Sequence, residues 1–124
     1  MGGAGNIYNT GRSIANTLTP YLYLSERFMT GSTLSYKYYV PNGNYQVTLK
    51  FAEIYFTTAN QRVMNISING AQVETNFDVF TKAGGAFTSF DKTYAVTVTN
   101  GQILLALAPA LAGHTPKISA IQIQ

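Results

Sequence analysis

The stretch LKFAEIYF, residues 49–56, begins as a half-buried β-strand and ends with a carboxylate among aromatic residues. Val47, Leu49 and Phe51 occupy every second position, which is the period of a strand with one apolar face. If the strand continues, Glu53 and Tyr55 lie on that same core-facing side. A buried carboxylate is strongly unfavourable unless it is paired, so the stretch predicts a cation beside Glu53.

Two arginines are available as partners of Glu53. Arg27 lies in SERF, residues 25–28, and Arg62 lies in NQRV, residues 60–63. The sequence therefore predicts a structural ion pair between Glu53 and Arg27 or Arg62. A direct contact between Glu53 and a ligand is the alternative.

The rest of the chain reads as further strands separated by turns. The dipeptides Asn69-Gly70 and Asn100-Gly101 stand between alternating runs and favour hairpins, and a proline opens the turn PNGN, residues 41–44. The segment 78–85 fits at most one helical turn, capped by Asp78. The predicted strands lie within 18–28 and at 33–40, 45–55, 62–68, 71–77, 92–99, 102–108 and 117–124. This pattern predicts one all-β domain over residues 1–124, an antiparallel β-sandwich or jelly roll.

Composition excludes several classes of function. The 124 residues include no cysteine, so disulfides and thiolate metal sites are excluded. The net charge of +3 comes from basic residues that are never adjacent, which argues against nucleic-acid binding. No run of residues is long and apolar enough for a membrane span, and the first residues lack the features of a signal peptide.

Catalysis and cofactors are not indicated. His114 is the single histidine, and no nucleophile motif accompanies it. A glycosidase needs two facing carboxylates, and nothing in the pattern of the five acidic residues indicates such a pair. Asp78 and Asp91 are expected to cap or brace turns, since no dense loop of oxygen ligands supports a calcium site. We therefore expect no enzyme activity and no cofactor.

Several stretches, taken in order, resemble the malectin family of carbohydrate-binding domains. They are YLSERF (23–28), VPNGNYQVTLKFAEIYF (40–56), QRVMNISINGAQV (61–73), NFDVFTKAGG (76–85), FDKTYAVTV (90–98) and PKISAIQI (116–123). Each stretch is weak alone, but the ordered set covers most of the chain after Asn16. The resemblance implies a jelly-roll sandwich that binds sugar against loop aromatics at one end.

The resemblance also implies which residues touch the sugar. The aromatic pair after FAE falls on Tyr55 and Phe56, and the aromatic residue after the ER pair falls on Phe28. A tyrosine in the preceding loop corresponds to Tyr8. An acidic residue that contacts sugar hydroxyls falls near His114 or Thr115, so either His114 takes over as hydrogen-bonding partner or the ligand differs.

The start of the chain also departs from the family pattern. Members open with a strand that carries a segment like INAGG, whereas this chain begins in what resembles the loop after it. We therefore expect a domain without that first strand, whose open sheet edge invites self-association or strand donation.

These observations lead to one functional expectation and one alternative. We expect a non-catalytic module that stacks an oligosaccharide or a glycan chain end on Tyr55, Phe56 and Phe28, with Tyr8 and His114 at the margin. We expect it outside the cell or at the cell surface within a larger protein, as in the bacterial glycan-acting members of the family. The alternative is a protein-interaction or self-assembly module that uses the same loops or the open edge.

Overall fold

The computed structural model describes residues 6–9, 14–15, 23, 25–28 and 33–124; the side chains at 6, 9 and 25–28 lie outside the description. The strand predicted within 18–28 is found at Ser25–Phe28, and residues 18–22 and 24 lie outside the described residues. No helix in the described part is long and apolar enough to cross a membrane. The elements are β1 (Asn6–Asn9), β2 (Ser25–Phe28), β3 (Leu34–Tyr39), β4 (Gly43–Ala52), β5 (Val63–Ile68), β6 (Ala71–Asp78), α1 (Val79–Ala83), β7 (Ser89–Val98), β8 (Gln102–Pro109), β9 (Lys117–Ile118) and β10 (Ala120–Ile123).

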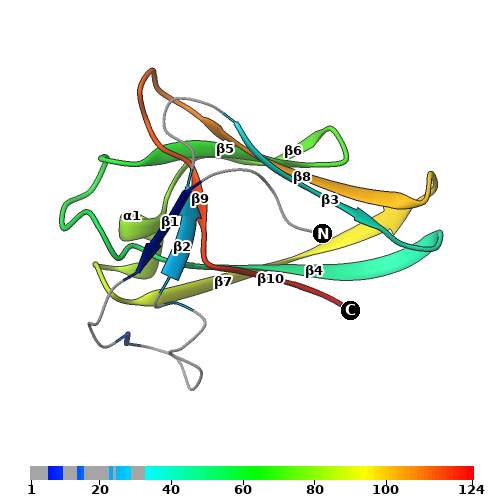
Figure 1. Cartoon of the computed structure of the whole chain (residues 1–124), viewed down its shortest axis with the longest axis horizontal. Helices are drawn as coiled ribbons and strands as arrows, with labels where there is room; N and C mark the ends of the chain where they lie inside the picture. Colours follow the sequence, from blue (N-terminus) through cyan, green and yellow to red (C-terminus); the bar gives the residue numbers. More distant parts are fainter. Residues whose placement is uncertain (1–5, 10–13, 16–22, 24, 29–32) are drawn as a thin grey trace.

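Two antiparallel sheets pack face to face and confirm the predicted all-β sandwich. One sheet has the order β3-β8-β5-β6 and the other has the order β10-β4-β7. A small third sheet, β1-β2-β9, crosses one end of the sandwich beside α1 (Figure 1). The third sheet and α1 therefore mark the end at which β4 terminates and β5 begins.

The core lies between the two large sheets and follows the predicted alternation. Val47, Leu49 and Phe51 of β4 are buried, whereas Thr48 and Lys50 on the opposite face are partly exposed. From β5, Met64 and Ile66 face the same core. The other buried members of this cluster are Leu34, Tyr36, Ile68, Phe77, Val79, Val98, Ile103, Leu105, Leu107 and Ile118.

The turn signals act as predicted at the β5–β6 hairpin. Asn69 and Gly70 both have positive φ, 50° and 84°, as a tight two-residue turn between twisted strands requires. Its register is Ile68 opposite Ala71. Gly101 at the β7–β8 turn also has a positive φ of 75°. The predicted hairpin at Asn69-Gly70 is therefore confirmed. The one at Asn100-Gly101 is wrong, because β7 pairs with β4 while β8 pairs with β3 and β5, so this turn carries the chain from one sheet to the other.

The helix after β6 begins where the sequence predicts, but Asp78 does not cap it. No hydrogen bond joins the Asp78 side chain to the first turn of the α1 backbone. Its Oδ2 accepts hydrogen bonds from the backbone N–H of Asn60 and from the Thr81 hydroxyl, both at 2.8 Å. Asp78 therefore braces the β4–β5 loop, because that loop offers a backbone donor within its reach. Asp91 accepts a hydrogen bond from the hydroxyl of Tyr23, which lies in a turn, and pairs with Lys50 of the neighbouring strand at 2.8 Å.

Candidate functional site

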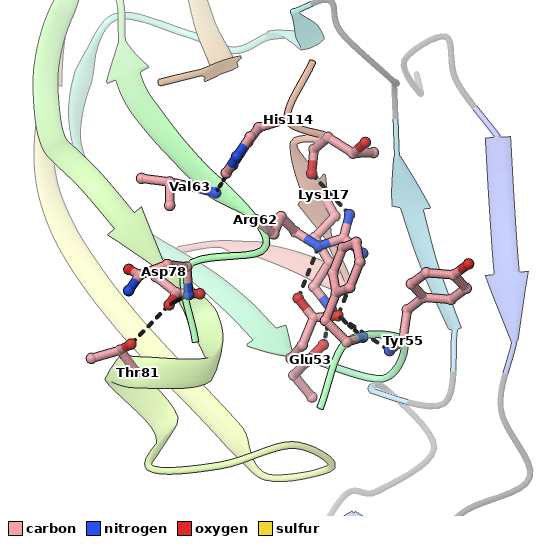
Figure 2. Close-up of polar contacts among 12 residues, drawn as sticks. Glu53, Tyr55, Arg62, Val63, Asp78, Thr81, His114 and Lys117 are labelled. Atoms are coloured by element: carbon pink, nitrogen blue, oxygen red, sulfur yellow. Dashed lines mark hydrogen bonds and ion pairs between the residues drawn. The ribbon is translucent and has the colours of Figure 1, made fainter. Parts of the chain in front are cut away.

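Glu53 is buried at the end of β4 and is paired, as the sequence requires of a core-facing carboxylate. Its Oε1 accepts a hydrogen bond of 2.8 Å from Arg62 Nε, and both side chains are almost fully buried (Figure 2). Arg62 Nη2 lies 3.4 Å from Oε2. The structure thus brings one of the two candidate arginines to Glu53. The other, Arg27, has a side chain outside the described residues.

Lys117 also lies beside Glu53, and the sequence reasoning missed it. Its Nζ is 3.7 Å from Glu53 Oε2, and it donates a hydrogen bond to the carbonyl oxygen of Ala52. Lys117 is fully buried at the start of β9. Alternation offered little signal: Lys117 shares the alternating positions of Ile121 and Ile123, but β9 and β10 belong to different sheets, and both Lys117 and Ile118 are buried.

The Glu53 carboxylate also turns the chain out of the sheet. Oε2 accepts hydrogen bonds from the backbone N–H groups of both Tyr55 and Phe56, each at 3.1 Å. A side-chain acceptor that captures consecutive amides competes with the strand ladder. The prediction that the strand continues to residue 55 is therefore wrong: β4 ends at Ala52.

This turn reverses the predicted burial of the next two residues. Tyr55, expected on the core-facing side, is 58% exposed, whereas Ile54 is 2% exposed. The reason is that both amides turn back to one carboxylate, so the alternation of the strand stops at Phe51. The result is a tyrosine ring presented to solvent from a rigid strand end.

Three aromatic side chains meet at this end of the sandwich and are here called the aromatic row: Tyr8, Tyr55 and Phe56. The ring centres of Tyr8 and Tyr55 are 5.3 Å apart with planes at 90°, and those of Tyr55 and Phe56 are 4.9 Å apart at 87°. The Arg62 guanidinium lies 5.0 Å from the centre of the Phe56 ring. Arg62 therefore supports Phe56 by a cation–π contact while it pairs with Glu53.

Tyr8 reaches the row from β1 at the edge of the small sheet. It packs on a second buried cluster that includes Ile14, Tyr23 and Ile54. The structure therefore brings together three of the five residues expected to bind ligand. Phe28 lies in β2, opposite Lys117 of β9 in register, but its side chain is outside the described residues.

His114 lies near the Arg62 side of the site, and its ring is already hydrogen-bonded within the protein. Its Nδ1 accepts a hydrogen bond of 2.9 Å from the backbone N–H of Val63. The next residue, Thr115, accepts a hydrogen bond of 2.8 Å at its carbonyl from Arg62 Nη1. Two consecutive residues of the β8–β9 loop are thus tied to the start of β5, His114 to the Val63 backbone and Thr115 to the Arg62 side chain. Whether His114 touches a ligand stays a prediction.

The charges around Glu53 determine its ionisation. Burial alone raises the pKa of Glu53, but the charges of Lys117 and Arg62, with hydrogen bonds from Arg62 and the Phe56 amide, outweigh burial. The net effect is a lowered pKa. Glu53 therefore stays ionised at neutral pH and holds the amides of Tyr55 and Phe56 as a charged acceptor.

We expect acidification to lower the stability of the fold, because it protonates Glu53. Because the pKa of Glu53 is lower in the folded protein, the unfolded chain takes up the proton at higher pH, and the stabilisation present at neutral pH is lost as the pH falls through the folded-state pKa. Thermal unfolding of the wild type and of Glu53→Gln from about pH 7 to about pH 3 measures this. The melting temperature of the variant should depend less on pH. Parallel curves for the two proteins would show that Glu53 does not carry this dependence.

No group of three or more His, Asp or Glu side chains in the described part of the chain is placed to hold a metal ion. A shallow groove of about 260 Å³ lies at the opposite end of β4 from the aromatic row. It is lined by Asn44, Tyr45, Gln46, Ala95, Val96, Thr97 and Gln124. This groove holds no charged side chain and no aromatic residue that is fully exposed.

A family model described as the malectin domain matches residues 4–121. The chain belongs to the malectin domain family. Malectin-B of Xenopus laevis is 33% identical over 85 residues, which make up 66% of this chain and 29% of Malectin-B. A probable LRR receptor-like serine/threonine-protein kinase of Arabidopsis thaliana is 32% identical over 135 residues, covering 95% of this chain and 13% of the kinase. The malectin domain described here thus spans less than a third of either relative.

Solved structures share the malectin-domain fold. The ANXUR2 extracellular domain from Arabidopsis thaliana superposes with a TM-score of 0.82 at 22% identity, over 96% of this chain and 38% of that one. A β-glucuronidase of Bacteroides uniformis superposes with a TM-score of 0.83 at 23% identity, over 98% of this chain and 13% of the enzyme. At these identities the likeness concerns the fold alone.

Proposed function

We propose that this malectin domain is a non-catalytic carbohydrate-binding module that stacks a short oligosaccharide or a glycan chain end on the aromatic row. The observation that carries the proposal is the exposed Tyr55 ring beside Phe56 and Tyr8, held by the buried pair of Glu53 and Arg62. Exposed aromatic rings on a rigid support offer apolar surface to the apolar face of a pyranose at little ordering cost. Membership of the malectin family supports this proposal.

The ring geometry favours a small ligand or a chain end. Successive rings of the row stand nearly perpendicular, at 90° and 87°. A flat polysaccharide surface would need coplanar rings, whereas perpendicular rings contact a single sugar unit from more than one direction. An open row of this kind buries only part of its ligand, so we expect weak binding per site, strengthened by multivalency or by attachment to other domains.

The buried carboxylate supports binding and does not suit catalysis. A general acid needs a raised pKa and access to the glycosidic oxygen. Glu53 has a lowered pKa and is fully buried. We therefore assign Glu53 the task of holding the loop that carries Tyr55 and Phe56. We propose an extracellular or lumenal location, because the similar ANXUR2 structure is described as an extracellular domain.

A glycan array of the purified domain tests the proposal, followed by calorimetric titration of the best oligosaccharide. We expect saturable binding to a limited set of glycans. No binding by a folded domain would contradict the proposal. Light scattering on the same sample addresses the alternative, because self-association without glycan binding would favour an assembly module that uses a sheet edge.

A further inference from the structure

The His114 side chain accepts a hydrogen bond that, within a sheet, a backbone carbonyl of the neighbouring strand would accept. Strand β8 ends at Pro109, opposite Met64 of β5. One residue further, the Val63 carbonyl still accepts a hydrogen bond of 2.9 Å from the Ala110 N–H. The Val63 N–H instead donates to His114 Nδ1, also at 2.9 Å. The imidazole thus takes the place of a backbone carbonyl at the start of β5.

This contact fixes the protonation state of the ring. Nδ1 accepts a hydrogen bond only when it carries no proton, so the ring is neutral with its proton on Nε2. An imidazolium ion carries N–H groups at both nitrogens, which would set two donors against each other at Val63. Imidazole is the side chain whose ordinary charge change falls between about pH 5 and pH 8. The contact therefore requires the neutral ring.

The contact is connected to the aromatic row through Arg62. The β8–β9 loop closes on itself, because the His114 N–H donates to the Leu111 carbonyl at 3.1 Å. Thr115 follows directly, and its carbonyl holds Arg62 Nη1 at 2.8 Å. Arg62 in turn lies 5.0 Å from the Phe56 ring centre. Release of His114 from Val63 therefore removes one of the contacts that hold the loop whose Thr115 carbonyl positions the guanidinium beside Phe56.

We propose that His114 is a positioning residue for glycan binding, which acts as the acceptor of the Val63 N–H and weakens binding when it is protonated. The inference rests on the proposed function of the aromatic row. Among the described residues, the charged side chains between His114 and the aromatic row are the cations Arg62 and Lys117 and the anion Glu53. Asp78 lies across β5, opposite Val63 in β6. Protonation would place a further positive charge beside Arg62.

Two variants separate positioning from a merely structural role. His114→Asn places an amide oxygen near the position of Nδ1 and does not titrate. His114→Ala removes the acceptor at every pH. Affinity for the best oligosaccharide is measured by calorimetry at about pH 8 and about pH 5. In parallel, NMR follows the Val63 amide proton of the wild type without ligand over the same range.

The wild type should bind more weakly at the lower pH, by roughly fivefold at most, because the energy of one hydrogen bond is the upper limit of its coupling to binding. His114→Asn should bind with little pH dependence, and His114→Ala should bind weakly at both pH values. A Val63 amide that does not respond to pH, or the same pH dependence in His114→Asn as in the wild type, would overturn the inference. If the Val63 amide titrates but affinity stays constant, the inference fails and the proposed function stands. If no glycan binds at any pH, the proposed function itself fails.

Discussion

Replacing Glu53 by glutamine is expected to destabilise the fold by about 3 to 5 kcal/mol, which lowers the melting temperature by roughly 10 to 20 °C. Glutamine has the same shape but removes the charge that Arg62 and Lys117 face in a buried site. Removing one member of a buried ion pair leaves the other charge poorly compensated. It also replaces a charged acceptor for the Tyr55 and Phe56 amides by a weaker one. Urea unfolding followed by circular dichroism measures the change.

The Glu74–Lys92 pair provides the control for the Glu53 variant. Lys92 lies 3.1 Å from Glu74, but its side chain is 48% exposed. Ion pairs with an exposed partner contribute little, so Lys92→Gln should change stability by less than about 1 kcal/mol. Equal effects of Glu53→Gln and Lys92→Gln would show that the buried pair does not hold this end of the sandwich together.

The largest effect on binding is expected from the double substitution Tyr55→Ala and Phe56→Ala. Truncation of a central aromatic contact typically weakens binding at least about thirtyfold. Because both rings belong to the row, calorimetry should show affinity below detection for an oligosaccharide that the wild type binds weakly. The fold should survive, since the Tyr55 side chain is 58% exposed and the contacts with Glu53 are made by backbone amides.

Tyr39→Ala is the matched control for the loss of an exposed ring. Tyr39 is 80% exposed and lies at the end of β3, opposite Gln102. That end of the sandwich is far from the small sheet that carries Tyr8 (Figure 1). Affinity should therefore be unchanged in Tyr39→Ala. If Tyr39→Ala lost binding and the double variant kept it, the row would not be the binding site.

The fold could be predicted from the sequence because its signals are local. Alternation at Val47, Leu49 and Phe51 follows from the geometry of a half-buried strand, and an Asn-Gly dipeptide closes the β5–β6 hairpin. These signals act within a few residues and do not depend on the partner strand. The family resemblance is likewise carried by ordered local stretches, and the family model that matches residues 4–121 confirms it.

The details of the site could be predicted only in part, because they depend on contacts between distant segments. The alternation rule extended β4 to Tyr55, but a carboxylate two residues earlier captures the Tyr55 amide and ends the strand. Lys117 joins Glu53 from the far end of the chain, through a two-residue strand that no local pattern isolates. His114 meets Val63 across 51 positions. Sequence spacing carries little information on such contacts.

The claim that the aromatic row binds sugar is tested most directly by NMR mapping of the oligosaccharide that the glycan array selects. Titration of the ¹⁵N-labelled domain should shift the amide signals of Tyr55 and Phe56, together with those of Tyr8 and its neighbours in β1. The amide signals of Gln46 and Thr97, which line the groove at the opposite end of β4, should not shift. Shifts confined to that groove, with Tyr55 and Phe56 unmoved, would contradict the account.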